Sequence, residues 1–204
     1  KIHKIYNGYD KLNYDKIKET KPNKFNIVFT GVLSKNHNYE IFLEILKVLS
    51  PIKQNLNMVF TLAGRIDDNI TKLYSNEIEL INKGYVNHDN AISIIKSSHL
   101  LINFNYKDTE ETDMISGKLI EYLASGTPII NFSNSANESQ EVLKLSPKSF
   151  NANTNSTKLV VDFIKSEYND WTEGNYKKQS LKNIDSLSRE SLTKKLLKII
   201  KGIK

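Results

Sequence analysis

Two hydrophobic patterns alternate along the chain. Short runs are apolar at nearly every position, and between them lie longer segments in which apolar residues recur every third or fourth position. The runs occupy Phe25–Leu33, Met58–Gly64, part of Glu77–Val86, His99–Phe104, Thr127–Phe132 and Ser149–Asn153. A short run that is apolar throughout is typical of a strand buried on both faces of a sheet, so we predict about six such strands.

The intervening segments are predicted to be helices. In Tyr39–Leu49, apolar residues at positions i, i+3, i+4 and i+7 share one helical face, and Pro51 follows the end of the segment. Further helices are expected at Asp67–Ser75, Asn90–Ser97, 116–125, 137–145 and throughout the region after Thr157. Strands that alternate with helices predict an α/β fold, namely a Rossmann-like, doubly wound parallel sheet with helices on both faces and further C-terminal helices.

The first 23 residues differ from the rest of the chain because they are polar and contain the turn signals Asn7-Gly8 and Pro22. We interpret residues 1–23 as an interdomain lead-in. Residues 24–204, including the C-terminal helices, are predicted to form a single domain.

Composition narrows the function classes only slightly. The net charge of +6 suggests an anionic partner such as nucleotide phosphates, nucleic acid or a lipid surface, and a merely lysine-rich surface explains it equally well. The absence of cysteine excludes disulfides and thiolate metal sites, and it fits a cytoplasmic protein. No apolar run is long enough to span a membrane, and no secretory signal is present in this sequence, which begins at Lys1.

Ligands of an open α/β sheet bind outside the carboxyl ends of the strands, which directs attention to the residues that follow each apolar run. The candidates are Gly31 with Lys35 and His37, Gly64 with Arg65, the loop 84–87 and the loop 106–118. Glycine allows close approach of the backbone to a ligand, although a single glycine more often ends a strand for structural reasons.

The segment SGKLIEYLASGTPII, residues 116–130, is the most informative of these. Ser116 can cap a helix whose apolar face is Leu119, Ile120, Leu123 and Ala124 and whose polar face is Lys118, Glu121, Tyr122 and Ser125. A lysine in the first turn is disfavoured by the helix dipole, and a phosphate bound to the free amides there would neutralise it. The alternative, slightly favoured by spacing alone, is an exposed Lys118–Glu121 pair.

Five stretches together resemble a known family. They are YNGYD (Tyr6–Asp10), FTGVL (Phe29–Leu33), TLAGR (Thr61–Arg65), GYV (Gly84–Val86) and DMISGKLIEYLASGTPII (Asp113–Ile130). In order and spacing they are similar to motifs of the C-terminal, nucleotide-sugar-binding domain of GT-B-fold glycosyltransferases, in the group with an E-x7-E motif. The likeness extends from about residue 3 to residue 200.

The resemblance implies a role for each matching residue. Glu121 stands where the family binds the ribose hydroxyls of the donor, and Asp113 stands where a glutamate lies near the transferred sugar, so Asp113 is the candidate catalytic residue. Ser116 and Gly117 would offer backbone amides to the sugar or diphosphate. Lys118 matches a lysine near the phosphates.

The resemblance also indicates which residues would contact the nucleobase and which cations would lie near the diphosphate. Tyr85 and Val86 correspond to the loop that meets the base. Many relatives carry an arginine just after the first-strand glycine and a lysine a few residues later, where this chain has Val32 and His37. The nearest substitutes are Lys35, Arg65 and Lys118.

The implied reaction is transfer of a sugar from a nucleoside diphosphate to an acceptor hydroxyl. The composition, rich in Asn, Lys and Ile, suggests a bacterium and therefore a surface polysaccharide as the product. No cofactor beyond the donor substrate, no metal and no nucleic acid is expected. The acceptor, a saccharide or a lipid-linked one, would bind an N-terminal domain that is absent from this chain, so the fragment alone should be inactive. The alternatives are a non-catalytic α/β ligand-binding or regulatory domain and half of a nucleotide-sugar epimerase.

The C-terminal sequence LTKKLLKIIKGIK has an apolar side surrounded by lysines. We expect it to pack against the partner domain, with contact to an anionic membrane as the alternative. The expected location is the cytoplasm, or its membrane face if that alternative holds.

Overall fold

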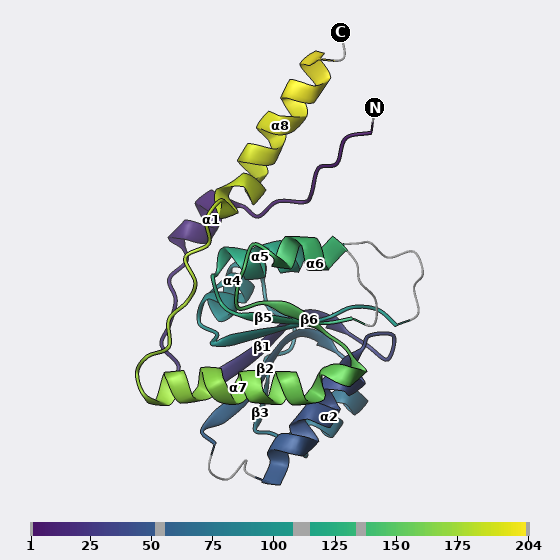
Figure 1. Ribbon diagram of the computed structural model, residues 1–204, viewed down its shortest axis with the longest axis vertical. Helices are drawn as coiled ribbons and strands as arrows, with labels where there is room; N and C mark the ends of the chain where they lie inside the picture. Colours follow the sequence, from purple (N-terminus) through teal and green to yellow (C-terminus); the bar gives the residue numbers. More distant parts are fainter. Residues whose placement is uncertain (1, 52–55, 108–114, 134–137, 203–204) are drawn as a thin grey trace.

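The computed structural model describes residues 2–51, 56–107, 115–133 and 138–202, and six strands in one parallel sheet form its centre (Figure 1). The strands are β1 (Phe25–Leu33), β2 (Met58–Ile66), β3 (Leu80–Asn82), β4 (Leu100–Phe104), β5 (Ile129–Phe132) and β6 (Phe150–Ala152). Their order is β3-β2-β1-β4-β5-β6, and every neighbouring pair is parallel. The predicted α/β fold is confirmed.

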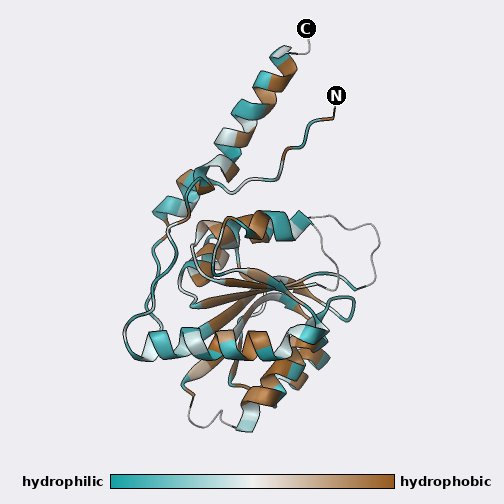
Figure 2. Cartoon of the chain, in the orientation of Figure 1, coloured by the Kyte–Doolittle hydropathy of each residue, from teal (hydrophilic) through white to brown (hydrophobic). Residues whose placement is uncertain are grey.

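Helices cover both faces of the sheet, as expected from the two-sided burial of its strands. The α-helices of the described residues are α1 (Lys11–Lys16), α2 (Tyr39–Leu49), α3 (Asp68–Ser75), α4 (His88–Lys96), α5 (Gly117–Ala124), α6 (Glu138–Leu143), α7 (Thr157–Thr172) and α8 (Arg189–Gly202). In Figure 1, α2 and α7 lie on one side of the sheet and α4, α5 and α6 on the other. Figure 2 shows the apolar strands enclosed between these two layers.

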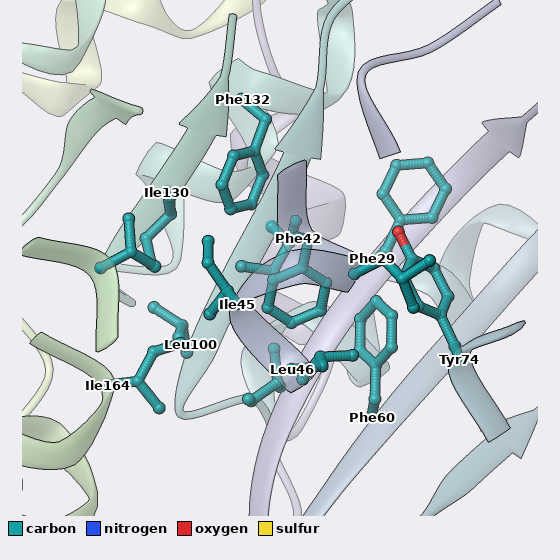
Figure 3. Packing of buried hydrophobic residues seen from close by; sticks show 14 of the residues in the cluster. Phe29, Phe42, Ile45, Leu46, Phe60, Tyr74, Leu100, Ile130, Phe132 and Ile164 are labelled. Carbon is teal, nitrogen blue, oxygen red and sulfur yellow. The ribbon is translucent and has the colours of Figure 1, made fainter. Parts of the chain in front are cut away.

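The larger of two hydrophobic clusters lies between the sheet and the α2–α7 layer. Phe42 of α2 is fully buried at its centre, with ring centroids 5.0 Å from Phe60 of β2 and 5.7 Å from Phe132 of β5 (Figure 3). Burying a side chain of this size contributes about 1.5–3 kcal/mol, so the predicted face of Tyr39–Leu49 fixes α2 against β2 and β5.

Gly64, the last residue of its predicted strand, lies inside β2, as Gly31 lies inside β1. β2 continues to Ile66, and Gly31 of β1 pairs in register with Gly64 of β2. Both have positive φ, 121° and 138°, and a Cβ at Gly64 would stand 1.9 Å from the Gly31 carbonyl oxygen. Gly64 is therefore required by the close approach of the two strands.

The lead-in is not merely a polar linker, because it forms α1 and packs on the body. Asp10 caps α1 by accepting a hydrogen bond from the Asn13 amide (3.0 Å), and Tyr14 is buried. Tyr9 donates its amide to the Leu187 carbonyl, and Arg189 donates its amide to the Tyr9 carbonyl. These contacts join the lead-in to the start of α8, which then extends away from the sheet in Figure 1.

Candidate functional site

A cleft opens at the carboxyl ends of β1 and β4, beside the first turn of α5. We call it the strand-end cleft. Its lining residues are Gly31, Val32, His37, Phe104, Asn105, Tyr106, Ser116 and Lys118, and its volume is about 340 Å³. The topology thus gathers residues from three separate segments at the edge of the sheet where ligands of this fold class bind.

Lys118 is the cation of this cleft. Its Nζ lies 4.2 Å from the centroid of the Phe29 ring, and a Cβ placed at Gly31 would be 3.4 Å from Nζ. Among the described residues, no carboxylate lies within ion-pair distance of it. Burial of the ammonium lowers the pKa of Lys118 to about 7. An anion in the cleft would restore the charged form.

The exposed Lys118–Glu121 pair does not form in the structure. Glu121 instead lies 3.5 Å from the Nε2 atom of His88, the first residue of α4. Burial raises the pKa of Glu121, and the nearby His88 and Arg189 oppose that rise. Lys118 and Glu121 therefore lie in two different environments, on either side of the first turn of α5.

Glu121 lines a second cavity, which we call the lead-in pocket, with a volume of about 450 Å³. Its lining residues are Ile5, Tyr6, Asn7, Gly8, Gly117, Glu121, Arg189, Leu192, Thr193 and Leu196. Gly117 lines this pocket and its neighbour Lys118 lines the strand-end cleft, so the two cavities flank the N-terminus of α5.

His37 borders the strand-end cleft and is almost fully buried. Its ring lies 4.3 Å from the Tyr106 ring, and its Nδ1 accepts the Ser34 amide (3.2 Å). Burial and then the charge of Lys118 lower the pKa of His37. The imidazole is consequently neutral at pH 7.

One prediction about α5 is confirmed in part, and another is wrong. Ser116 has the extended backbone of an N-cap residue, φ −60° and ψ 130°, but its side chain makes no capping hydrogen bond. Tyr122, placed on the polar face, is fully buried because its hydroxyl accepts the Thr30 amide of β1 (2.8 Å). Burial raises the pKa of Tyr122 to about 12.

The sequence model for glycosyl transferases group 1 matches residues 24–155, which is more than half of the chain. The chain belongs to the group 1 glycosyl transferases. No curated protein sequence matches it.

Solved structures show the same fold at low identity. HepE of Anabaena, in complex with UDP-glucose, is similar with a TM-score of 0.65 and 14% identity over 97% of this chain and 57% of that one. The pneumococcal O-GlcNAc transferase GtfA, in complex with UDP and GlcNAc, gives 0.59 and 12% over 98% and 38%. The catalytic domain of cholesterol-α-glucosyltransferase from Helicobacter pylori gives 0.51 and 16% over 83% and 99%.

These likenesses confirm the predicted glycosyltransferase fold. The chain spans only 57% of the HepE chain and 38% of the GtfA chain, so it corresponds to part of those enzymes.

Several residues predicted for the donor site line neither cavity. Lys35 is exposed in the turn after β1, and Val86 is half-buried before α4. Arg65 is exposed, with its guanidinium carbon 6.0 Å from the ring of Tyr85, which is itself 77% exposed. Asp113, the candidate catalytic residue, lies outside the described residues.

Sequence reasoning missed Asn105 and Arg189, which border the two cavities, and His88, which contacts Glu121. Asn105 directly follows the apolar run of β4, and that position was the signal that could have identified it. Arg189 reaches the lead-in pocket only because α8 returns beside the lead-in. His88 meets Glu121 across a gap of 33 residues, and no local signal marks that contact.

No metal centre can be assigned to the glycosyltransferase from its described residues, which hold no group of three histidine, aspartate or glutamate side chains suited to a metal ion. In the same part of the chain, no helix combines the length and apolar character needed to cross a membrane.

Proposed function

We propose that this chain is the donor-binding half of a glycosyltransferase that moves a sugar from a nucleoside-diphosphate sugar to an acceptor hydroxyl, in the synthesis of a bacterial surface polysaccharide. Membership of group 1 supports the reaction class. HepE in complex with UDP-glucose and GtfA in complex with UDP and GlcNAc, both similar in fold, support a nucleotide-sugar donor.

The observation that carries the proposal is the environment of Lys118. Its ammonium lies at the carboxyl end of a central strand, in a cleft, beside the N-terminus of a helix and without a carboxylate partner among the described residues. The departing diphosphate gains negative charge in the transition state, and a placed cation together with helix amides stabilises such charge. Lys118 and the first turn of α5 supply both.

The other candidate residues are assigned to the remaining parts of the same nucleotide-sugar donor. Glu121, facing the lead-in pocket, binds the ribose hydroxyls, and Tyr85 with Val86 meets the base. Asp113 acts near the transferred sugar. The reaction uses the donor as substrate and needs no further cofactor.

We propose that the acceptor, a saccharide or a lipid-linked one, binds a separate N-terminal domain, and the partial coverage of the HepE and GtfA chains supports this proposal. The same domain covers α8, where Leu196, Leu197 and Ile200 are 43–54% exposed. Reaction at a lipid-linked acceptor would place the enzyme at the cytoplasmic face of the membrane.

The test is an NMR titration of the chain with UDP, GDP and ADP, because a half-site binds weakly. The variants are Lys118→Met, Glu121→Ala and the matched control Lys72→Met, a change at an exposed lysine of α3. We expect one diphosphate to bind selectively, and both site variants but not the control to weaken it about tenfold or more. Binding of none would overturn the proposal in favour of a non-catalytic α/β domain.

The products of the reaction distinguish a glycosyltransferase from the alternative, a nucleotide-sugar epimerase. The complete enzyme, given donor and acceptor, should yield a glycosylated acceptor, whereas an epimerase would interconvert the sugar while it remains on its nucleotide.

The occupant of the exposed side of α8 is tested with anionic liposomes. The chain and a variant in which Leu196, Leu197 and Ile200 are all changed to Ser should both remain in the supernatant, because we assign this surface to the partner domain. Sedimentation of the unaltered chain alone would assign it to the membrane.

A further inference from the structure

Three buried or half-buried asparagines form a ladder across β4, β5 and β6. Asn103, Asn131 and Asn151 are register partners on adjacent strands. Asn103 Nδ2 donates to Asn131 Oδ1, and Asn131 Nδ2 donates to Asn151 Oδ1 (2.7 Å). Asn103 and Asn131 are at most 1% exposed. Amides in such a place are costly unless they are hydrogen-bonded, and Asn103 Oδ1 and Asn151 Nδ2 have no hydrogen-bond partner among the described residues.

The ladder reaches the strand-end cleft through Asn105. Asn103 Nδ2 also donates to Asn105 Oδ1 (3.1 Å), and Asn105 lines the cleft beside Lys118. The Asn105 backbone is held on both sides, since its amide donates to the Phe132 carbonyl and its carbonyl accepts the Asn38 amide, each at 2.9 Å. Asn105 is therefore a fixed residue despite its place after the strand.

These hydrogen bonds determine what Asn105 offers to a ligand. A carboxamide has one acceptor oxygen and a nitrogen with two N–H donors. The oxygen is occupied by Asn103, and Asn105 Nδ2 donates to none of the described residues. The Nδ2 group is thus a pair of neutral donors on a residue that lines the same cleft as Lys118.

We propose that Asn105 is a donor-substrate ligand of the strand-end cleft, whose Nδ2 group donates hydrogen bonds to oxygens of the diphosphate or of the attached sugar, and that the Asn103–Asn131–Asn151 ladder positions it. This inference rests on the proposed function and adds a neutral recognition group to the cation Lys118. The orientation of the side-chain amides matters here. If the oxygen and nitrogen of every amide in the ladder exchanged places, Asn105 would present an acceptor oxygen to the cleft instead.

Two variants of Asn105 test its role, and two variants of Asn169, exposed on α7, serve as matched controls. Asn105→Ala removes the donors. Asn105→Asp keeps an oxygen that can accept from Asn103 but replaces the donors with a negative charge. We expect about tenfold weaker binding for the alanine variant and about 100-fold weaker binding for the aspartate variant, while Asn169→Ala and Asn169→Asp remain unchanged. Thermal unfolding confirms that each variant is folded.

The probes are UDP, GDP and ADP, and the sugar nucleotides UDP-glucose, GDP-mannose and ADP-glucose. Equal weakening for a nucleotide and its sugar conjugate assigns the contact to phosphate, and weakening for the conjugate alone assigns it to the sugar. In the unaltered chain, the side-chain NH2 resonances that disappear in Asn105→Ala should shift when the probe is added.

Failure of this inference is distinguishable from failure of the proposed function. If the unaltered chain binds a probe but neither Asn105 variant changes its affinity, Asn105 is not a ligand, and the glycosyltransferase proposal stands. Full binding by Asn105→Asp would show a reversed ladder and also overturn the inference. If the unaltered chain binds no probe, both proposals fail together.

Discussion

The two ends of the parallel sheet each carry a cavity with basic residues, and the cavities differ in how those residues are paired. The one at the amino ends of the strands, here the amino-end cavity, has a volume of about 560 Å³ against about 340 Å³ for the strand-end cleft. Its half-buried lysines are paired: Lys96 Nζ donates to the Tyr14 and Ile17 carbonyls, and Lys178 Nζ donates to Glu19 (2.8 Å).

Buried His99 at the same end is also paired, since its Nδ1 accepts the Asn26 amide (2.9 Å) and its carbonyl accepts the Tyr176 hydroxyl. The half-buried Lys118 at the other end makes no hydrogen bond or ion pair with the described residues, and its Nζ lies near the Phe29 ring and Gly31. The two cavities therefore differ more clearly in whether their basic side chains have hydrogen-bond partners than in their volumes. Groups that the protein satisfies hold the fold together, and groups that it leaves unsatisfied are available to a ligand.

The largest expected effect concerns the backbone that shapes the strand-end cleft. Gly64→Ala places a Cβ against the Gly31 carbonyl in a backbone conformation that L-residues rarely adopt. We expect a loss of about 3–5 kcal/mol in the free energy of unfolding, from overpacking and from strain at positive φ. Chemical denaturation measures it.

Gly84→Ala is the matched control, because Gly84 also has positive φ (60°) but no atom within 4 Å of the added Cβ. Strain alone should cost it about 1 kcal/mol. Equal losses for the two variants would mean that close approach of the strands does not shape this end of the sheet.

The next largest effect concerns the dependence of stability on pH and arises from His99 at the amino ends of the strands. Burial and then the charge of Lys178 lower the pKa of His99 to about 4, whereas in the unfolded chain it is about 6.5. Between these values the unfolded chain binds a proton that the folded chain does not, so stability falls as the pH falls. The loss attributable to His99 is about 3 kcal/mol when it is complete.

His99→Asn checks this, since the asparagine oxygen can still accept the Asn26 amide. Urea unfolding at pH 7, 5.5 and 4 should give a shallower decline for the variant than for the unaltered chain. Parallel declines would show that His99 does not cause the acid sensitivity.

A smaller effect is expected in the strand-end cleft, where ligand affinity should depend on pH through Lys118. The pKa of Lys118 is about 7 in the free protein, and a bound diphosphate raises it. Binding then takes up a proton, so affinity is fully present below pH 7 and is lost as the pH rises. We expect a decline approaching tenfold per pH unit between about pH 7 and 9.

Calorimetric titration with the diphosphate that binds, repeated at several pH values, measures this decline. The pKa of His37 is lowered, and so His37 does not titrate in this window. Lys118→Met should bind weakly at every pH, with no slope. A slope that survives in this variant would assign the proton to another group.

The same distinction explains which features could be predicted from the sequence. Two-sided burial leaves continuous apolar runs, so β1, β4 and the fold class were predictable. Lys118 was found because a lysine in a first helical turn is locally unfavourable. Tyr122 was misplaced because its helical position alone does not reveal that Thr30, 92 residues away, supplies a buried amide for its hydroxyl. The asparagine ladder depends likewise on strand register, which only the folded chain establishes.

The smallest expected effect concerns the contact between His88 and Glu121. The imidazole is half-exposed and lies 3.5 Å from the carboxylate, and such surface pairs contribute about 0–1 kcal/mol. His88→Gln should therefore change the free energy of unfolding by less than about 0.5 kcal/mol in urea, because Glu121 is held only loosely. A loss well above 1 kcal/mol would make this pair structural, like those at the amino end. It would then remove Glu121 from the groups that the protein leaves available to a ligand.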